Sequence, residues 1–316
     1  MSAPLISVII TSYNKGEYIS QAISSIIRQT YSNKEIIVVD DCSRDNTLEI
    51  CKQYVKDIKL IVNMTNQGLV KSRYTGVNAA NGDFILFLDA DDWLSHNSLT
   101  ELCTTQCKYD ADIVQMKIVW RLTPLKIPVN FRSDYDKSQA FNACLYNDRL
   151  FPVQIWGKLY RKDLLNDNPF AGYGRFWGED RLLNLPIMHR NPKIEIASGA
   201  IYNYRWGGES VNGFRKEALY DYINVYKLKH DWITQNGYSC FAQELDKELY
   251  LFLNYYIRQM IDSGHYTEKV ILEYLKDELG KSFWGNIYPG ISAEVLYRNN
   301  KNSVSRKLKK IVKRII

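Results

Sequence analysis

Strand-like and helix-like segments alternate over the first 90 residues, and this alternation constrains the fold more than any other feature of the sequence. Short apolar runs rich in β-branched residues are separated by longer segments in which apolar residues recur with helical spacing. The expected strands are residues 5–10, 35–39, 59–62 and 84–88, and the expected helices are residues 19–27, 47–55 and 68–80. Because strands that alternate with helices form βαβ units, we expect an α/β fold with a mostly parallel sheet flanked by helices.

The pattern is less regular after residue 110, where strand-like and short helical pieces are mixed. The strand-like pieces are residues 112–120, 193–197 and 200–204. We expect them to extend the sheet, so that residues 1–212 form one domain. Residues 213–297 are rich in Tyr, Leu and Lys at helical spacing and predict a helical subdomain, and residues 298–316 form a basic tail.

Polar side chains follow three of the expected strands, at the point where each strand ends. These residues are Thr11 and Tyr13, Asp40 and Asp41, and Asp89, Asp91 and Asp92. Because the carboxyl ends of parallel strands meet at one edge of a sheet, we expect these side chains to face a common crevice. Clustered carboxylates are ligands that suit Mg²⁺ or Mn²⁺. An isolated acidic turn, or an acidic cap on the following helix, is the alternative interpretation.

The net charge of +6 comes entirely from the tail. Residues 306–316 hold six basic residues and no acid, so residues 1–305 are close to neutral. A nucleic-acid-binding domain would carry basic charge in its body, and we therefore expect no nucleic-acid partner. We find neither a secretory signal nor an apolar stretch near the roughly 20 residues that cross a bilayer, so we expect a cytosolic or peripheral protein.

Several motifs in this order resemble those of the inverting family-2 glycosyltransferases, which have a GT-A fold. The motifs are Val8–Asn14, Val38–Thr47, Asn66-Gln67-Gly68, Arg73–Gly76, Phe87–Asp92, Gly178-Glu179-Asp180 and Ile201–Arg205. One departure is Tyr74, which stands where the family usually has Asn. The last motif is common in members that build bacterial surface polysaccharides. The resemblance covers about residues 4–212 and is specific to the family, not to a donor or an acceptor.

The resemblance implies that residues 1–212 bind a UDP-sugar donor. It places uridine against Thr11, Tyr13 and Asp41, with Asp41 accepting a hydrogen bond from the base. In the alternative, Asp40 and Asp41 cap the helix near Asn46, where negative charge is also favourable. We prefer Asp41 for the base and Asp40 for structure.

Weaker candidates for ribose or phosphate contacts are Asn66, Lys71 and Arg73, although a Lys or Arg on a helix is often merely solvated. For the diphosphate, we expect Asp91 to ligate Mn²⁺ or Mg²⁺. Asp89 would reach the ribose or a metal-bound water, and Asp92 would join the metal or cap the next helix. Such a metal acts as a Lewis acid that stabilises charge on the leaving diphosphate.

The catalytic base must lie on the acceptor side, because inversion at the anomeric carbon requires one carboxylate positioned there. We expect Asp180 to be this base, with Glu179 as the alternative. In a purely structural interpretation, this pair caps the helix over residues 181–189.

The tail predicts a basic amphipathic helix. Its apolar residues are Val304, Leu308, Ile311, Val312, Ile315 and Ile316, and the six basic residues fall between them. Such a helix can lie on an anionic membrane surface, where each cation contributes on the order of 1 kcal/mol. An oligomerisation helix, and hence a homo-oligomer, or a packed terminal helix are the alternatives.

Together, these features predict a metal-dependent inverting glycosyltransferase in bacterial cell-surface polysaccharide biosynthesis. Its acceptor would be a saccharide, which we expect to be lipid-linked because such acceptors reside at the membrane. The enzyme would lie at the inner face of the cytoplasmic membrane. The alternatives are a non-catalytic nucleotide-sugar-binding partner subunit and a membrane-surface binding module. Donor sugar, acceptor and linkage do not follow from the sequence.

Overall fold

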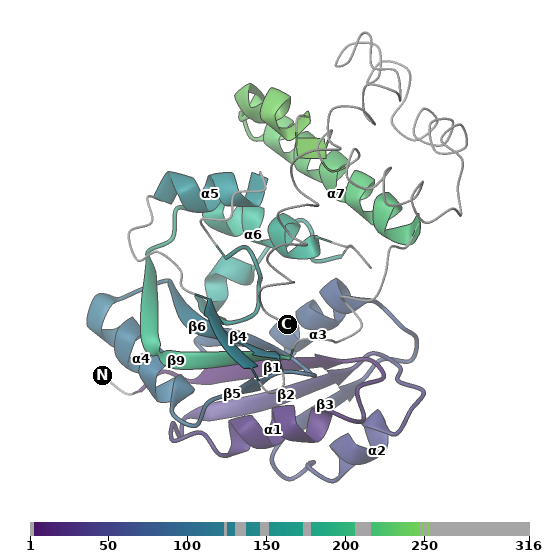
Figure 1. Ribbon diagram of the computed structural model, residues 1–316, viewed down its shortest axis with the longest axis vertical. Coiled ribbons are helices and arrows are strands. Elements are labelled where there is room, and N and C mark those ends of the chain that lie inside the picture. The colour runs from purple at the N-terminus through teal and green to yellow at the C-terminus, as the bar shows by residue number, and fades with distance from the viewer. Residues whose placement is uncertain are drawn as a thin grey trace. The chain divides into compact units, whose positions relative to one another are not determined.

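The computed structural model describes residues 3–122, 125–129, 137–145, 152–172, 178–205, 216–246, 248–249 and 252. The chain divides into two compact units, Met1–Gly213 and Phe214–Ile316. The first unit holds a nine-stranded sheet with helices against it (Figure 1).

The strands of this sheet are β1 (Ile6–Ser12), β2 (Lys34–Asp40), β3 (Lys59–Val62), β4 (Phe84–Asp89), β5 (Trp93–Leu94), β6 (Ile113–Leu122), β7 (Leu125–Val129), β8 (Lys158–Arg161) and β9 (Ile194–Arg205). Their order is β3-β2-β1-β4-β8-β6-β9-β5, and β7 pairs with β6. The strands β1 to β4 are parallel to one another, as is the pair β6 and β9. The strand β8 runs antiparallel to both β4 and β6, so it joins the two parallel parts.

The helices of the first unit are α1 (Ile19–Ile27), α2 (Thr47–Lys52), α3 (Leu69–Ala79), α4 (Ser98–Tyr109), α5 (Lys137–Leu145) and α6 (Glu179–His189), with the 3₁₀ turn η1 (Lys162–Leu165). In Figure 1, α1 and α2 cover one face of the sheet and α3 lies on the other. All seven residues of the central strand β1 are buried, which places the core on both faces of the sheet. The alternation over the first 90 residues therefore has its predicted result.

The second unit begins with α7 (Lys216–Gln235), followed by the 3₁₀ turn η3 (Ser239–Phe241). Lys229 is buried in α7 and forms an ion pair of 3.1 Å with Glu248. The expected subdomain over residues 213–297 is described only in this first part. The expected tail over residues 298–316 lies outside the described residues.

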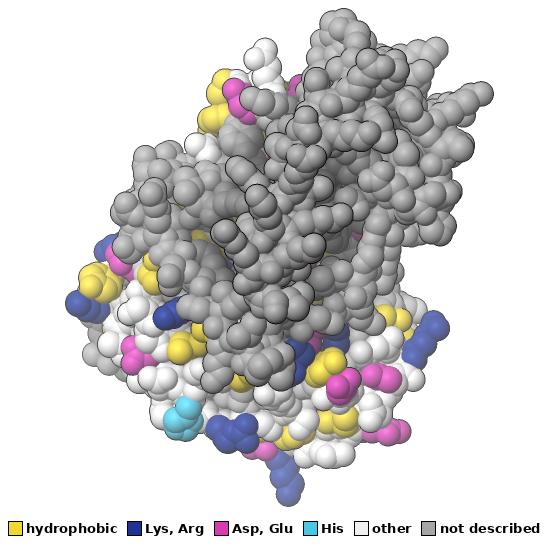
Figure 2. All heavy atoms as spheres, in the orientation of Figure 1, with side chains coloured by type: hydrophobic (Ala, Val, Ile, Leu, Met, Phe, Trp, Pro, Cys, Tyr) yellow, Lys and Arg dark blue, Asp and Glu magenta, His cyan; other side chains and the backbone are white. Residues whose placement is uncertain are grey.

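In the part of the chain that the structure describes, no helix is both long and apolar enough to cross a membrane. Figure 2 shows basic and acidic side chains interspersed on the described surface facing the viewer.

Candidate functional site

Strand register brings the predicted polar residues together at one edge of the sheet. Thr11 at the end of β1 is the Cα partner of Asp89 at the end of β4. On the other side of β1, Ser12 is the partner of Asp40 in β2. The expectation that these strand ends share one crevice follows from the parallel pairing. Thr11 is buried, whereas Tyr13, in the loop after β1, is half-buried.

Arg73 occupies the centre of the site, at a position where the sequence suggested only a weak substrate contact. Its guanidinium lies 3.1 Å from Asp89, 3.2 Å from Asp180 and 3.4 Å from Glu179. The side chain is 1% exposed, although it comes from the middle of α3. Burial alone would lower the pKa of Arg73, but the carboxylates of Asp89, Asp180 and Glu179 raise it above its ordinary value. A permanent buried cation therefore joins the end of β4 to the start of α6.

Glu179 and Asp180 form the first turn of α6, directly after Gly178. Gly178 has φ of 93°, a conformation that a residue with a Cβ rarely adopts, so a glycine is favoured where the chain turns into this helix. Burial and the neighbouring Asp180 raise the pKa of Glu179 to about 8, against the opposing effect of Arg73. This shift favours the protonated form of Glu179, and the prediction that Asp180 is the base stays a prediction.

Lys158 and Tyr160 of β8 are two buried neighbours of Asp180 that the sequence interpretation did not assign to the site. Burial lowers the pKa of Lys158 to about 7, although Asp180 opposes the shift. Its ammonium group donates to the Gln154 carbonyl. Burial, and next Asp180, raise the pKa of Tyr160 well above its usual value, and its hydroxyl bonds to Asn184 at 3.0 Å. The strand β8 reads Lys-Leu-Tyr-Arg, and this short sequence does not distinguish a site residue from a packing residue.

The Asp91 carboxylate lies 2.9 Å from the Lys15 ammonium group, and both side chains are about one-fifth exposed. Lys15 belongs to the loop after β1, and its backbone N–H donates to the Thr47 hydroxyl at 2.8 Å. This lysine was not among the predicted site residues. Its only sequence signal was its place in the loop that follows the first strand.

Asp92 is 1% exposed and has both oxygens engaged. The Tyr202 hydroxyl donates to one oxygen at 2.7 Å, and the Arg205 backbone N–H donates to the other at 2.7 Å. The same Tyr202 hydroxyl accepts the Asp89 N–H at 3.2 Å. Asp92 therefore fixes the acidic turn against β9, and the prediction that it ligates a metal stays a prediction.

Arg205, the last residue of β9, closes one side of this turn. Its guanidinium lies over the rings of Tyr18 at 4.7 Å and Trp93 at 4.9 Å. Its Nε donates to the Asp91 carbonyl at 2.9 Å. An arginine held in this way places positive charge beside the turn that carries Asp91.

Asp41 is buried and organises the loop before α3. One of its oxygens accepts the Gln67 N–H at 2.7 Å and an Asn63 amide N–H at 2.8 Å, while the other accepts the Gly68 N–H at 2.8 Å. Asp40 accepts the Ser43 N–H at 3.1 Å through one oxygen, and its other oxygen is buried without a hydrogen-bond partner. The contact of Asp41 with a base stays a prediction.

The remaining predicted contacts lie around the same helix. Asn66 is exposed in the loop before α3, and Lys71 is half-buried one turn into it. Their predicted ribose or phosphate contacts are untested, as is that of Arg73. Within the described residues, no group of three or more His, Cys, Asp or Glu side chains is arranged to hold a metal ion.

Comparison with known proteins identifies the family to which this fold and site belong. Residues 7–167, just over half of the chain, match the family model described as glycosyl transferase family 2. The chain belongs to glycosyl transferase family 2. The family resemblance seen in the motifs is thereby confirmed.

Curated relatives in this family include bacterial glycosyltransferases. Glycosyltransferase GlyA of Streptococcus pneumoniae serotype 4 is 30% identical over 212 residues, 63% of this chain and 30% of GlyA. The poly(ribitol-phosphate) beta-N-acetylglucosaminyltransferase TarS of Staphylococcus aureus is 30% identical over 207 residues, 63% of this chain and 35% of TarS. The chain thus spans about a third of the length of these two relatives. An uncharacterized glycosyltransferase of Haemophilus influenzae is 28% identical over 302 residues, 88% of this chain and 92% of that protein.

Solved structures of TarS share the fold. The crystal structure of S. aureus TarS residues 1–349 in complex with UDP-GlcNAc has a TM-score of 0.59 and 23% identity, over 87% of this chain and 80% of that one. The complex of the same TarS fragment with UDP has a TM-score of 0.57, also at 23% identity, over 86% of this chain and 78% of that one. These matches confirm the predicted GT-A fold class.

Proposed function

We propose that this chain is a metal-dependent inverting glycosyltransferase that moves a sugar from a UDP-sugar to a saccharide acceptor in bacterial surface-polysaccharide synthesis. The observation that carries the proposal is the bridge made by Arg73. It holds Asp89, at the strand ends where a donor would bind, together with Asp180, the carboxylate suited to act as base. Family membership and the UDP and UDP-GlcNAc complexes of TarS support a UDP-sugar as the donor.

The nucleotide would bind in the crevice at the ends of β1 and β2. Tyr13 offers a ring for stacking, and Asp41 offers a carboxylate beside the loop that it already organises. Lys15 pairs with the Asp91 carboxylate and Arg205 donates to the Asp91 carbonyl, so both would supply positive charge near the diphosphate. These cations would balance charge that the diphosphate brings into the site.

A divalent cation fits the carboxylates of Asp89 and Asp91. Both are partly exposed, and burial together with Asp91 and Asp180 raises the pKa of Asp89 despite the attraction of Arg73. Two carboxylates suffice, because Mg²⁺ is commonly held by one or two carboxylates plus substrate phosphates. Bound there, Mn²⁺ or Mg²⁺ would act as a Lewis acid for the leaving diphosphate.

Asp180 would take the proton from the acceptor hydroxyl as that oxygen attacks the anomeric carbon from the face opposite the departing UDP. The guanidinium of Arg73, 3.2 Å away, would hold this carboxylate in position. The pKa of Glu179 is raised, which favours its protonated form, and its side chain lies beside the guanidinium. General base catalysis of this kind contributes roughly 10²- to 10⁴-fold to a rate.

The test is UDP release from a panel of UDP-sugars by the wild-type chain and by Asp180→Asn. We expect the variant to bind UDP within threefold of wild type and to lose at least about 100-fold in turnover, as removal of a general base predicts. Asp57→Asn, an exposed acid far along the sequence from this motif, is the matched control and should retain full turnover. Turnover of Asp180→Asn within tenfold of wild type would move the base to another residue.

We also propose that residues 304–316 attach the enzyme to the inner face of the cytoplasmic membrane, where a lipid-linked acceptor would be found. The six cations and the apolar spacing of the sequence support this. Deletion of residues 304–316 should abolish binding to vesicles that contain anionic lipid while UDP release continues. Vesicle binding that survives the deletion would place the membrane contact elsewhere.

A further inference from the structure

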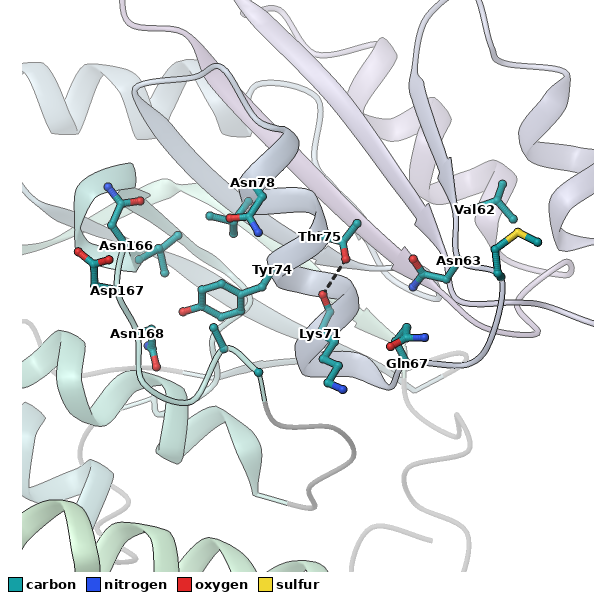
Figure 3. Close-up of a pocket in the computed structure, with 15 residues that line it drawn as sticks. Val62, Asn63, Gln67, Lys71, Tyr74, Thr75, Asn78, Asn166, Asp167 and Asn168 are labelled. Carbon is teal, nitrogen blue, oxygen red and sulfur yellow. Dashed lines mark hydrogen bonds between the residues drawn. The ribbon is translucent and has the colours of Figure 1, made fainter.

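A groove of about 960 Å³ lies between α3 and the segment 165–172, apart from the carboxylates of the site. Figure 3 shows its polar lining, with side chains from both walls pointing into the space. Five of the lining residues carry a side-chain amide: Asn63, Gln67, Asn78, Asn166 and Asn168. This volume is in the range of natural ligand sites, about 300 to 1,000 Å³. We call it the α3 groove.

One wall of the α3 groove is a single face of the helix. Lys71, Thr75 and Asn78 recur at helical spacing and line the groove, whereas Arg73 on the adjacent face points to the carboxylates. The Thr75 hydroxyl is already used, since it donates to the Lys71 carbonyl at 3.0 Å. The amides of Gln67 and Asn78 are on exposed side chains and can contact a ligand.

The opposite wall is fixed to α6. The Asn168 side chain donates to the Leu183 carbonyl at 2.9 Å and accepts the Phe170 N–H at 3.0 Å, so its amide anchors the wall. Asn166 and Asp167, next to it, are exposed. A groove held at both walls by packed helices is preformed, which lowers the entropic cost of binding.

Tyr74 lies between the two walls, where the family motif usually has Asn. Its side chain is 7% exposed, and burial raises the pKa of its hydroxyl. Its hydroxyl points toward the side chain of Asn168, which partly opposes this rise in pKa, so Tyr74 packs between the two walls (Figure 3).

The charge and chemistry of the lining indicate the class of ligand. Lys71 and Asp167 contribute one charge of each sign, so the groove does not favour a polyanion. Amide groups both donate and accept hydrogen bonds, which matches the hydroxyl groups of a sugar. The apolar side chains of Val62 and Met64 at one end, 43% and 92% exposed, can contact the apolar face of a sugar ring.

The α3 groove shares its walls with the candidate active site. Asn63 and Gln67 line the groove and also hydrogen-bond Asp41, through a side-chain amide and a backbone N–H. Across the groove, Asn168 is tied to α6, the helix that begins with Glu179 and Asp180. A chain lying in the groove would therefore be bound by the two elements that carry the donor-side and acceptor-side residues.

We propose that the α3 groove binds sugar units of the acceptor chain beyond the sugar that receives the transferred residue. This rests on the proposed glycosyltransferase function, and adds a second saccharide site that selects a chain of neutral sugars over a single sugar. The α3 groove would bind the acceptor, and the carboxylates around Arg73 would carry out the transfer.

Asn78→Trp tests the proposal, because an indole at this exposed helix position would fill the groove. Thr104→Trp, at an exposed position in α4, is the matched control. The probe is an array of oligosaccharides from bacterial surface polysaccharides, with bound members confirmed by saturation-transfer NMR on the full chain. We expect wild type and Thr104→Trp to bind at least one neutral oligosaccharide, and Asn78→Trp to bind it at least tenfold more weakly.

UDP affinity, measured on the same three proteins, separates this proposal from the proposed function. We expect it to be equal in all three. The groove proposal is overturned if the wild type binds no neutral oligosaccharide on the array, if it binds only phosphorylated ones, or if Asn78→Trp binds as well as the control. A wild-type chain that fails to bind UDP would instead refute the glycosyltransferase assignment.

Discussion

Replacement of Arg73 by methionine should destabilise the first unit strongly. The variant keeps most of the side-chain volume but removes the cation that lies within 3.4 Å of three carboxylates. Removing one partner of a buried ion pair costs about 3 to 5 kcal/mol. The carboxylates are 13% to 25% exposed and water can partly solvate them, so we expect the lower end, about 3 kcal/mol. For a unit of this size, that corresponds to a fall in Tm of roughly 6 to 12 °C.

The pH dependence of this loss has a definite sign. Without Arg73, the folded-state pKa values of Asp89 and Glu179 rise further above their unfolded values. The penalty is smallest at low pH, as the acids become protonated in both states, and grows as the pH rises toward 8. Low pH should therefore narrow the difference in stability between the variant and the wild type.

Urea denaturation at pH 4.5 and pH 7.5 measures both effects. Arg161→Met is the matched control, because Arg161 also pairs with two carboxylates, Asp110 and Asp112, but is 33% exposed. Exposed pairs contribute about 0 to 1 kcal/mol each, so this control should lose little stability. If Arg73→Met at pH 7.5 is no less stable than Arg161→Met, or if it loses the same stability at both pH values, Arg73 does not stabilise the carboxylates as described.

Three further predictions concern buried groups. Between pH 7 and 10, the free energy of unfolding of the wild type should rise by up to about 1.4 kcal/mol per pH unit, because the unfolded Lys158 binds a proton that the folded one has lost. Lys158→Met should reduce this rise, and an equal pH dependence of the free energy of unfolding in urea would contradict the prediction. Tyr202→Phe should cost about 1 to 3 kcal/mol, since it removes the partner of Asp92, and calorimetry should show a lower Tm with ring packing retained; an unaltered Tm would show that the hydroxyl contributes nothing. Gly76→Ala should cost about 1 to 3 kcal/mol, because the added Cβ would lie 2.4 Å from the Ile9 side chain, and a variant as stable as wild type in urea would mean that Ile9 moves freely.

The sequence predicted the first part of the fold well because local patterns decide it. The strands β1 to β4 are apolar runs, and the helix α1 begins and ends at the predicted residues. The strand β9 was predicted as two strands, residues 193–197 and 200–204, but it is continuous. Its pairing with β6 shifts register between Met116 and Lys117, so residues 198–200, which include the gap between the two predicted pieces, have no Cα partner in β6.

Long-range pairing explains what the sequence did not predict. The strand β5 has two residues, and it pairs with β9, more than 100 residues later. Arg73 could be placed on a helix, but its partners lie 16 to 107 residues away, so no local pattern shows that three carboxylates surround it. The same is true of Tyr202 and Asp92, which are 110 residues apart. Parallel topology predicted where the acids would gather, while their partners come from elements folded onto them.

Titration of UDP into the full chain by isothermal calorimetry tests the central claim most directly. With Mn²⁺ present, the account predicts saturable binding that weakens at least tenfold when EDTA is added or when Asp91 is replaced by alanine. Both changes remove the cation that would link the Asp91 carboxylate to the diphosphate. Failure of the wild type to bind UDP, or binding that is equally tight in EDTA and in Asp91→Ala, would contradict a metal-dependent UDP-sugar site at the end of β4.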